Sequence, residues 1–431
     1  MKRKKKKVNV VHPAETRENM ERPRICIPIT ESTRDEIVAR AGEFASLRAD
    51  MVEWRIDFFT GGEEEIAGIA AQVKQALAGK ELIATLRTMA EGGEENGSRF
   101  DYRSVLTGLA EGAAAYVDVE VRRGQDVVAA VRAAAAKAGT RVIGSCHDFD
   151  RTPPEEEIVA VLTEARELGA DIGKFACMPG GEEDTGREDV ERLLAATEKM
   201  KKRYPDFPII TMSMGECGKD SRRYGGLYGS AVSFACVGKP SAPGQTTLDE
   251  LNGVFDQIYC GRRHISLIGF MGVGKSTISR KLHTMTGRPE VDTDARIVER
   301  EGCSIARIFE EKGEAYFRRL ETELLDGLGA LEPSIISCGG GMAMRDLNVK
   351  KLRAMGEIVL LTATPETIYG RVKDSRDRPL LNGNMNVPYI KELMEKRRPF
   401  YERAATAVVA TDGKSVSEIA AEIVRKCKIN S

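Results

Sequence analysis

Residues 24 to about 255 repeat one local pattern, in which short runs rich in apolar and β-branched residues alternate with longer stretches of helical periodicity. The short runs predict eight strands, at 24–30, 50–57, 82–87, 116–121, 141–149, 171–178, 208–214 and 231–237. Eight strand–helix alternations in about 230 residues fit a closed (β/α)8 barrel of the TIM type, whose active site lies at the C-terminal ends of the strands. A doubly wound open sheet shares this alternation and is the structural alternative.

Charged side chains fall in or near the ends of these apolar runs, where the active site of a barrel would lie. They are Glu53, Arg55, Arg87, Asp118, Glu120, His147 and Lys174. Burying so many charges without partners would be prohibitive, so we expect these side chains to face one another or a ligand.

Lys174 interrupts the run 171–178, which is otherwise largely apolar. A lysine at such a position can protect the edge of a sheet or extend its amine to solvent. Inside a barrel the amine would lose solvation, its pKa would fall, and it would become a nucleophile toward carbonyl carbon. His147 ends the preceding run. It is either a structural histidine or, beside a lysine that forms a Schiff base, the proton carrier that this chemistry requires.

Seven segments of this half resemble the type I 3-dehydroquinate dehydratase family, over roughly residues 24–255: 53–57, 87–93, 117–120, 145–149, 171–179, 212–222 and 241–245. The resemblance implies that Lys174 condenses with the ketone of 3-dehydroquinate and that the protonated imine acts as an electron sink. His147 would remove the adjacent carbon-bound proton and later protonate the departing hydroxyl, while Glu91 orients and tunes it. The resemblance implies no cofactor for this reaction.

The same resemblance implies the substrate-binding residues, which are Glu53, Arg55 and Arg87 for hydroxyls, Arg222 for the carboxylate, and Ser241 and Gln245 from a loop after the eighth strand. A class I aldolase, which uses the same lysine chemistry, is the alternative. Aldolases usually bind phosphate near the last two strands. Arg222 and the segment 241–245 are better suited to a single carboxylate.

The second half opens with residues 269–276, which match the Walker A pattern G-x-x-x-x-G-K-[ST] between a predicted strand and a predicted helix. In this pattern, backbone N–H groups converge on phosphate oxygens at the positive end of a helix. The nucleotide-binding residues are therefore predicted to be Gly272, Val273, Gly274, Lys275, Ser276 and Thr277. Lys275 would reach the β- and γ-phosphates, and the Ser276 hydroxyl would ligate Mg²⁺. The pattern predicts a P-loop NTPase domain, with three α/β/α layers and a parallel sheet.

Five further segments accompany this loop, at 291–294, 314–321, 337–341, 378–381 and 397–401, and with them residues 264–431 resemble shikimate kinase. The resemblance implies that Asp292 supports Mg²⁺ and that shikimate is bound by Asp294, Arg318, Gly340 and Arg397. It also makes Arg378 a lid arginine over the phosphates of ATP and Arg371 a contact on the adenine side. Asp294 could orient or deprotonate the attacking hydroxyl, and Lys275 and Arg378 could stabilise charge on the transferred group. A gluconate- or nucleotide-type kinase of the same fold is the alternative.

The composition limits which partners the chain can bind and which cellular compartment suits it. Lys and Arg total 65 against 66 for Asp and Glu, so no global field would attract nucleic acid, although residues 2–7 form a basic run. No stretch is apolar for long enough to span a bilayer. The nine cysteines are scattered without a C-x-x-C pair, which favours a reducing cytoplasm over a disulfide framework or a zinc site.

The expected organisation is a flexible basic tail at 1–22, a dehydratase barrel at 23–257, a linker at 258–263 and a kinase domain at 264–431. A homodimer through the barrel is one expected assembly. A reduction must separate the two reactions, and the sequence offers no third domain for it, so we expect no direct channelling. Either half could instead be a non-catalytic module, but the presence of Lys174, His147, Lys275, Asp292 and Asp294 favours catalysis.

Overall fold

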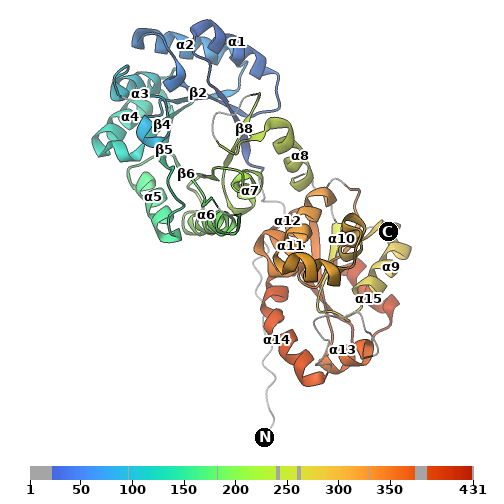
Figure 1. Cartoon of the computed structure of the whole chain (residues 1–431). Coiled ribbons are helices and arrows are strands. Elements are labelled where there is room, and N and C mark those ends of the chain that lie inside the picture. The colour runs from blue at the N-terminus through green and yellow to red at the C-terminus, as the bar shows by residue number, and fades with distance from the viewer. Residues whose placement is uncertain are drawn as a thin grey trace. The chain divides into compact units, whose positions relative to one another are not determined.

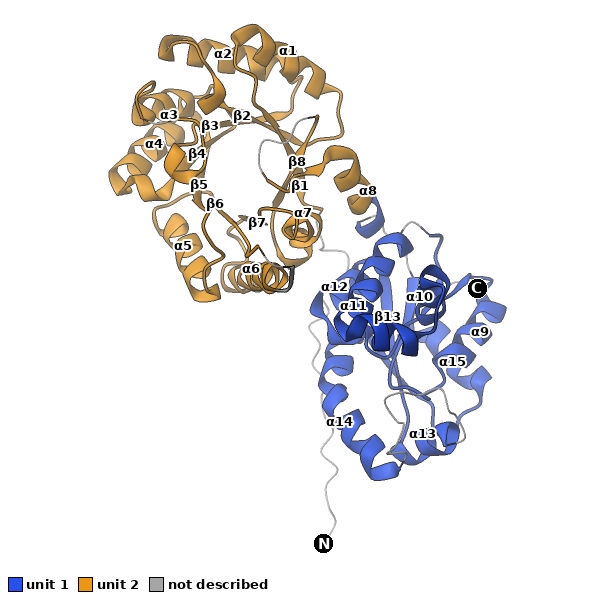
Figure 2. Cartoon of the chain, viewed as in Figure 1, with its two compact units in different colours: residues 1–21, 256–431 blue, residues 22–255 orange. Residues whose placement is uncertain are grey.

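The computed structural model describes residues 22–95, 97–181, 183–238, 243–259, 264–329, 331–373 and 386–429. The chain forms two compact units (Figure 2). Residues 22–255, drawn in orange, are called the first unit here because they come first in the sequence, and residues 256–431, drawn in blue, are called the second unit. Several predictions fall outside the described residues: those for the tail up to residue 21, for linker residues 260–263, for Ser241 and for Arg378.

The first unit is built on eight parallel strands, which are β1 (Arg24–Ile29), β2 (Met51–Arg55), β3 (Glu81–Thr85), β4 (Tyr116–Glu120), β5 (Arg141–Asp148), β6 (Ile172–Cys177), β7 (Ile209–Ser213) and β8 (Val232–Cys236). Every predicted strand is confirmed to within two residues at either end. A short strand, β9 (Thr246–Thr247), pairs with β8.

The strand order shows that this sheet curls into a barrel. Consecutive strands are neighbours from β1 to β7, and β8 pairs with β1. The sheet curls until β7 and β8 meet at an isolated bridge between Ile209 and Ser230, and there the N–H of Ala231 donates to the Ile209 carbonyl at 2.7 Å. The doubly wound alternative is wrong, because no switch point interrupts the order of the strands.

Helices surround this ring of strands on the outside (Figure 1). They are α1 (Arg34–Ala45), α2 (Glu63–Ala76), α3 (Tyr102–Ala110), α4 (Gln125–Ala138), α5 (Glu155–Glu167), α6 (Glu183–Arg203), α7 (Lys219–Tyr224) and α8 (Leu248–Ile258). Helix α4 illustrates the pattern. Its alanine-rich sequence buries Val128, Val131 and Ala135 on one face, and the helix ends at Gly139 in the left-handed conformation that glycine adopts readily.

One apolar cluster draws residues from all eight strands and therefore fills the interior of the barrel. Its members include Cys26, Met51, Ile83, Tyr116, Ile143, Ile172, Ile210 and Val232. Most of them stand near the beginnings of their strands, so the cluster closes the N-terminal end of the barrel. The C-terminal ends are left for the polar residues.

The second unit contains a five-stranded parallel sheet in the order β11-β12-β10-β13-β14, which confirms the predicted parallel sheet. The strands are β10 (His264–Ile268), β11 (Glu290–Asp292), β12 (Ile335–Ser337), β13 (Gly356–Thr362) and β14 (Ala407–Ala410). Strand β10 lies between β12 and β13. From β10 the chain passes to β11 and β12 on one side of it, and then crosses to β13 and β14 on the other side. The loop after β10 therefore lies at the topological switch point, where open α/β sheets bind ligands.

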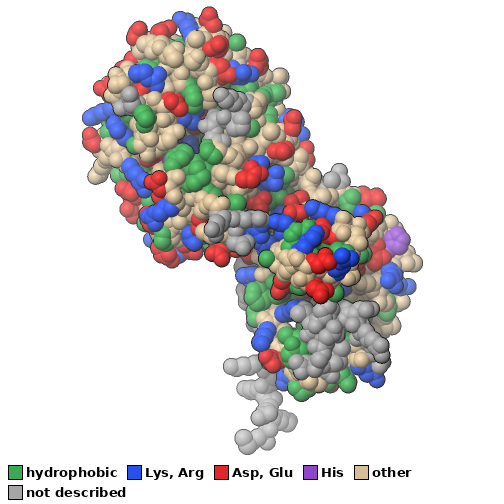
Figure 3. Space-filling model, in the orientation of Figure 1, with side chains coloured by type: hydrophobic (Ala, Val, Ile, Leu, Met, Phe, Trp, Pro, Cys, Tyr) green, Lys and Arg blue, Asp and Glu red, His purple; other side chains and the backbone are tan. Residues whose placement is uncertain are grey.

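Helices α11 and α12 lie on one side of this sheet, with α9 and α15 on the other (Figure 2). The helices of the unit are α9 (Lys275–Thr286), α10 (Thr293–Glu301), α11 (Ile305–Leu328), α12 (Asp346–Met355), α13 (Pro365–Val372), α14 (Val387–Ala404) and α15 (Val416–Lys426). In the part of the chain that the structure describes, no helix is both long and apolar enough to cross a bilayer. Basic and acidic side chains are interspersed on the face shown in Figure 3.

The close approach of β10 to β13 depends on a glycine at the start of β13. A Cβ on Gly356 would lie 1.9 Å from the carbonyl oxygen of His264, on backbone that cannot move aside. We therefore expect Gly356→Ala to destabilise the second unit by at least about 1–3 kcal/mol, the usual range for overpacking. Thermal unfolding followed by calorimetry would measure this loss as a lower transition temperature.

Gly327→Ala is the matched control, because nothing lies within 4 Å of the corresponding Cβ and the residue is inside helix α11. This replacement should be neutral or stabilise the unit by about 0.5–1 kcal/mol, since alanine is the better helix former. Equal unfolding temperatures for the two variants would contradict the close-approach argument.

Candidate active sites

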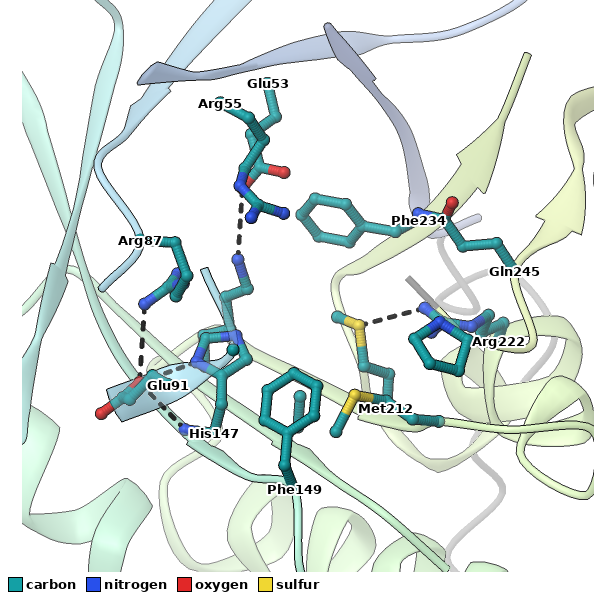
Figure 4. Close-up of a pocket in the computed structure, with 15 residues that line it drawn as sticks. Glu53, Arg55, Arg87, Glu91, His147, Phe149, Met212, Arg222, Phe234 and Gln245 are labelled. Carbon is teal, nitrogen blue, oxygen red and sulfur yellow. Dashed lines mark hydrogen bonds and ion pairs between the residues drawn. The ribbon is translucent and has the colours of Figure 1, made fainter. Parts of the chain in front are cut away.

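The alternation of side chains along each strand places the predicted polar residues of the first unit inside the barrel. Residues at i, i+2 and i+4 of a strand point to the same face. Met51 and Ile172 belong to the apolar cluster inside the barrel. Glu53 and Arg55 stand two and four residues after Met51, and Lys174 stands two residues after Ile172, so these side chains also point inward. The same count on the neighbouring strands brings in Asp118, Glu120, Ser145 and His147. One pocket at the C-terminal ends of the strands is lined by many of these side chains (Figure 4).

Lys174 is 4% exposed and stands at the centre of the charged network in this pocket. Its Nζ donates to Asp118 Oδ2 at 2.8 Å, lies 3.4 Å from Glu53 Oε1, and is 4.8 Å from the centre of the Phe234 ring. The strand that carries it pairs on both sides, with β5 and with β7. The interpretation of Lys174 as an edge-strand or solvent-reaching lysine is therefore wrong.

Asp118 is fully buried and accepts from three side chains. Besides Lys174, these are Arg87 Nη2 at 2.7 Å and Ser145 Oγ at 2.5 Å. Burial opposes ionisation, but the charges of Arg87 and Lys174 outweigh it and hold the pKa of Asp118 well below its usual range. Asp118 is thus an anion that anchors two buried cations.

Arg87 is held by protein groups on several sides. Its Nη1 donates to Ser145 Oγ at 2.9 Å and Glu120 Oε1 at 3.2 Å, and lies 3.5 Å from Glu91 Oε2. Burial disfavours the cation, but the carboxylates of Asp118, Glu120 and Glu91 raise the pKa of Arg87. The guanidinium is therefore fixed in place and permanently charged.

His147 and Glu91 form a hydrogen-bonded pair on the pocket wall (Figure 4). Glu91 Oε2 accepts the backbone N–H of His147 at 3.0 Å and lies 2.8 Å from the ring Nδ1. Burial, followed by the positive charges of Arg87 and Lys174, lowers the pKa of His147 well below its usual value. Burial raises the pKa of Glu91 to about 8. We assign the ring proton to Nδ1, because a carboxyl oxygen faces it, which leaves a lone pair on Nε2.

The remaining two arginines of the pocket differ in their partners. Arg55 donates through Nε and Nη2 to both oxygens of Asp57, at 2.8 and 2.7 Å. Arg222, on helix α7, is buried, and its Nη1 donates to Met212 Sδ at 3.1 Å. Within the described residues its Nε and Nη2 have no hydrogen-bond partner, and burial lowers its pKa to about 10. Arg222 is therefore suited to receive an anion. Gln245 lines the same pocket.

In the second unit, residues 269–274 form the loop between β10 and helix α9. Gly269, Gly272 and Gly274 have positive φ angles of 142°, 77° and 103°, which only glycine adopts readily. Lys275 begins the helix and folds back over the loop, with its Nζ 2.9 Å from the Gly269 carbonyl oxygen and 3.3 Å from that of Phe270. The loop has the form of a phosphate cradle.

A hydroxyl and a carboxylate from two different elements meet beside this loop. Ser276 Oγ donates to Asp292 Oδ2 at 3.2 Å, while Asp292 Oδ1 accepts the backbone N–H groups of Asp294 and Ala295, both at 3.1 Å. These are hard oxygen donors of the kind that Mg²⁺ prefers. Thr277, the next predicted phosphate contact, is exposed on the first turn of α9.

The residues predicted to bind the substrate that accepts the phosphoryl group lie around the glycine turn 339–341 after β12. A Cβ on Gly339 would lie 2.4 Å from Asp294 Oδ1, and one on Gly341 would lie 1.7 Å from Arg318 Nη1. Arg318 also pairs with Glu321 and with Glu314, each at 2.8 Å. Larger residues in this turn would displace the polar side chains that surround it.

Helix α14 brings two further residues to the same turn. The Tyr401 hydroxyl donates to the Gly340 carbonyl oxygen at 2.7 Å, and a Cβ on Gly340 would lie 3.6 Å from Arg397 Nη1. Arg371 lies elsewhere, against the phosphate loop, where its Nη1 donates to the Val273 carbonyl oxygen at 2.9 Å. The predicted residues thus divide between the loop and the turn.

Four residues for which the sequence predicted no individual role hold predicted site residues in place. They are Asp57, Asp118, Glu321 and Tyr401. Asp118 was expected among the charged side chains that face one another, and the inward parity of β4, counted from Tyr116, agrees with its contacts to Lys174 and Arg87. Glu321 and Tyr401 stand three and four residues after the predicted Arg318 and Arg397, the spacings at which helix residues are neighbours.

Comparison with known proteins accounts for both units. Residues 25–261 match the family model described as type I 3-dehydroquinase, and residues 271–428 match the one described as shikimate kinase. A 3-dehydroquinate dehydratase of Clostridioides difficile is 40% identical over 246 residues, covering 55% of this chain and 92% of that protein. One from Lactiplantibacillus plantarum is 42% identical over 233 residues, covering 53% of this chain and 90% of that protein.

Solved structures agree with the first unit. A type I 3-dehydroquinate dehydratase from Clostridium difficile, with covalently modified comenic acid, superposes with a TM-score of 0.51 at 39% identity, covering 55% of this chain and 92% of that one. The 3-dehydroquinate dehydratase of Geobacillus kaustophilus gives a TM-score of 0.52 at 32% identity, covering 56% and 93%.

The network around Asp118 generates a prediction about stability. Asp118→Asn would leave Lys174 and Arg87 with one buried anion fewer, and we expect it to destabilise the first unit by about 3–5 kcal/mol. Trp54, the one tryptophan of the chain, is fully buried in β2, so its fluorescence during urea unfolding reports on this unit. Asp126→Asn is the control, because that side chain is 75% exposed and its loss should change stability by less than about 0.5 kcal/mol. A similarly small effect at Asp118 would refute the anchoring role.

Proposed function

The chain belongs to the type I 3-dehydroquinate dehydratase family through residues 25–261 and carries a shikimate kinase domain over residues 271–428, and we propose that Lys174 and the loop before Lys275 are its two centres of catalysis. It is a bifunctional enzyme of the shikimate pathway, a lyase joined to a transferase. The observation that carries the residue assignment is the buried Lys174 amine, which shares one pocket with the His147–Glu91 pair.

The dehydration begins at Lys174. Its amine, after passing a proton to a neighbouring carboxylate, attacks the ketone carbon of 3-dehydroquinate, and water leaves to give a protonated imine. Glu53 Oε1, 3.4 Å from Nζ, is the carboxylate oxygen that can take this proton, because Asp118, at 2.8 Å from Nζ, is kept ionised by Arg87. The positive imine takes the place of the ammonium between them, so the charge balance of the pocket is preserved.

His147 carries the proton of the elimination. Its Nε2 takes the proton from the carbon beside the imine, and the bonding electrons move to the imine nitrogen to form an enamine. The enamine then expels the hydroxyl on the next carbon, and the same imidazole gives it the proton, so that it leaves as water. Hydrolysis of the conjugated imine releases 3-dehydroshikimate and restores the amine.

The substrate is held by the polar residues around the pocket. We assign its carboxylate to Arg222, whose guanidinium is buried beside a sulfur atom and without an acidic partner in the described residues. Its hydroxyls are assigned to Glu53, Arg55 and Arg87, with Gln245 and Ser241 closing from the loop after β8. One such cation favours a carboxylate over the phosphate that an aldolase would bind.

At the kinase site, the phosphates of ATP would lie on the backbone of residues 272–277, with Lys275, Arg378 and Arg371 around the nucleotide. Ser276 and Asp292 fit Mg²⁺, which when bound would neutralise charge on the phosphate oxygens. Asp294, Arg318, Gly340 and Arg397 are assigned to shikimate. Asp294 orients the attacking hydroxyl and takes its proton as the phosphoryl group is transferred.

We also propose a cytoplasmic enzyme without a nucleic-acid partner, which forms a homodimer through the barrel. The free thiols of Cys26, Cys146, Cys177 and Cys236 support a reducing compartment. A hydride-dependent reduction of 3-dehydroshikimate must come between the two reactions. We therefore propose that 3-dehydroshikimate leaves the barrel site into solution and that shikimate enters the kinase site from solution.

Two lysine substitutions test the assignment of the two centres. Lys174→Met should lower dehydration by on the order of a thousandfold or more and abolish borohydride trapping with 3-dehydroquinate, because no other amine replaces the nucleophile. Lys275→Met should lower shikimate-dependent ADP release by about 100-fold or more, because a charge at the transferred phosphate is lost.

Each variant should retain the other activity, which provides an internal control for folding. Lys199→Met, on the surface of α6 with 46% of its side chain exposed, is the neutral control for the barrel. Trapping that persists in Lys174→Met would disprove the Schiff-base assignment. A loss of both activities in either single variant would argue against two independent centres.

The His147–Glu91 pair predicts how dehydration depends on pH. Because burial raises the pKa of Glu91 to about 8, its carboxyl is protonated below that pH and ionised above it, while His147 stays neutral. The ionised carboxylate is the stronger acceptor for Nδ1–H and makes Nε2 the stronger base. We expect kcat/KM to rise with pH and level off above about 8, as measured with steady-state rates in buffers of constant ionic strength.

Glu91→Gln removes the titrating group and keeps an acceptor for Nδ1–H. We expect this variant to lose the rise near pH 8 and to reach a plateau about 10- to 100-fold lower, a part of the contribution of a general base. An unchanged profile in Glu91→Gln would assign the titration to another group.

A further inference from the structure

Asp57 is a fully buried carboxylate that none of the steps above uses. It lies in the 3-10 turn Ile56–Phe58, directly after β2, and its side chain has no exposed surface. Both of its oxygens accept from Arg55, with Nε 2.8 Å from Oδ1 and Nη2 2.7 Å from Oδ2. This two-point contact fixes both the position and the plane of a guanidinium that lines the pocket.

The same two oxygens accept from a second part of the chain. Oδ1 lies 3.4 Å from the backbone nitrogen of Arg87, and Oδ2 accepts the backbone N–H of Glu94 at 3.1 Å. These two positions flank the 3-10 turn Met89–Glu91, which carries the partner of His147. The Asp57 carbonyl oxygen also accepts from Arg99 Nη2, at 2.5 Å. Asp57 therefore stands between Arg55 and the segment that presents Glu91.

Only a carboxylate can occupy this position. Each oxygen has two donors in front of it, so an amide would turn its NH₂ group toward donors on one side, whichever way it was rotated. Burial opposes the charge of Arg55, but the hydrogen bonds and the charge of Asp57 outweigh it and raise the pKa of Arg55. Loss of the anion would leave a buried cation without its close partner.

We propose that Asp57 is a positioning residue that couples Arg55 to the Glu91–His147 pair. One carboxylate sets both the guanidinium that meets a substrate hydroxyl and the backbone segment that holds the carboxyl behind the base. Arg55 and Glu91 stand at separate places on the pocket wall (Figure 4), so binding and proton transfer share a support that touches neither the substrate nor the reacting atoms. The inference rests on the proposed roles of Arg55, Glu91 and His147.

The test measures the steady-state kinetics of dehydration by Asp57→Asn in the whole chain. The kcat value is calculated from the concentration of sites that borohydride traps with 3-dehydroquinate, not from the total protein concentration. Expressing kcat in this way removes the contribution of unfolded molecules. We expect KM to rise about tenfold through Arg55 and kcat to fall about 10- to 100-fold through Glu91, on the scale of a charge-assisted hydrogen bond. Wild-type values of both constants would overturn the proposal.

A double variant separates the two branches. Arg55→Met alone should raise KM and leave most of kcat. Adding Asp57→Asn to Arg55→Met should lower kcat but raise KM no further, because the Arg55 branch is already lost. Fully multiplicative changes in KM would mean that Asp57 does not act through Arg55.

Glu95→Gln is the matched control for a purely structural role. Glu95 is 1% exposed, lies in the same segment, and accepts from the backbone N–H of Gly97 and from the backbone and side chain of Arg99, without a contact to Arg55. We expect its kcat and KM to stay within about twofold of wild type, even where its unfolding temperature falls as far as that of Asp57→Asn. Equal kinetic losses in the two variants would reduce Asp57 to a stabilising residue.

A second measurement does not depend on the folding of Asp57→Asn. In Arg55→Met, Asp57 loses its main partner, so the amides of Arg87 and Glu94 should exchange with deuterium at least about threefold faster than in the wild type. Unchanged exchange rates at these two amides would refute the proposed coupling between Arg55 and the segment that carries Glu91. An active Lys174→Met would instead refute the proposed mechanism, whereas an inactive Lys174→Met with a fully active Asp57→Asn would refute the coupling alone.

Discussion

The ion pair between Lys174 and Asp118 is the interaction on which the first active site depends. A lysine amine inside a barrel is stable as a cation only when an anion compensates for the water it has lost. Asp118 provides that anion at 2.8 Å and is itself kept ionised by Arg87. The barrel explains why these groups meet, because Lys174 comes from β6, Asp118 from β4 and Arg87 from the segment just after β3, and the curled sheet brings the three together. The charge that the proposed chemistry requires is thus also a charge that the folded barrel must compensate.

Much of this arrangement follows from the sequence, since two periodicities carry it. The alternation of strands and helices located all eight barrel strands, and the period of two along β2, β5 and β6 turns Glu53, His147 and Lys174 inward. Asp57 and Asp118 were not assigned roles, because their importance lies in which donors reach them. Apart from Arg55, which stands two residues before Asp57, donors to these two carboxylates come from segments some 30 to 60 residues away. Only the closure of the sheet determines such pairings.

The two sites use the polypeptide in different ways. The barrel site is made of charged side chains, so its parts are visible in the sequence as unexpected polar residues within apolar strands. The kinase site is made largely of backbone, with positive φ angles at Gly272 and Gly274 and side chains packed against Gly339 and Gly341. A glycine pattern in the sequence predicts such a site, but it does not show which side chains occupy the space that the missing Cβ atoms leave. Glu321 and Tyr401 were missed for that reason.

Arg222 and Arg318, which are assigned to the two different substrates and could each meet a substrate carboxylate, begin from opposite electrostatic states. Arg222 is buried without an acidic partner among the described residues, so a substrate carboxylate would be its first anion and would relieve the cost of desolvation. Arg318 is already paired with Glu314 and Glu321, so a carboxylate there must enter by exchange or by sharing. Binding at the first site therefore adds a missing charge, whereas binding at the second rearranges charges that are already balanced. Since both proposed substrates are carboxylates on a six-membered carbon ring, this difference in the ground state of the protein would distinguish the two sites energetically.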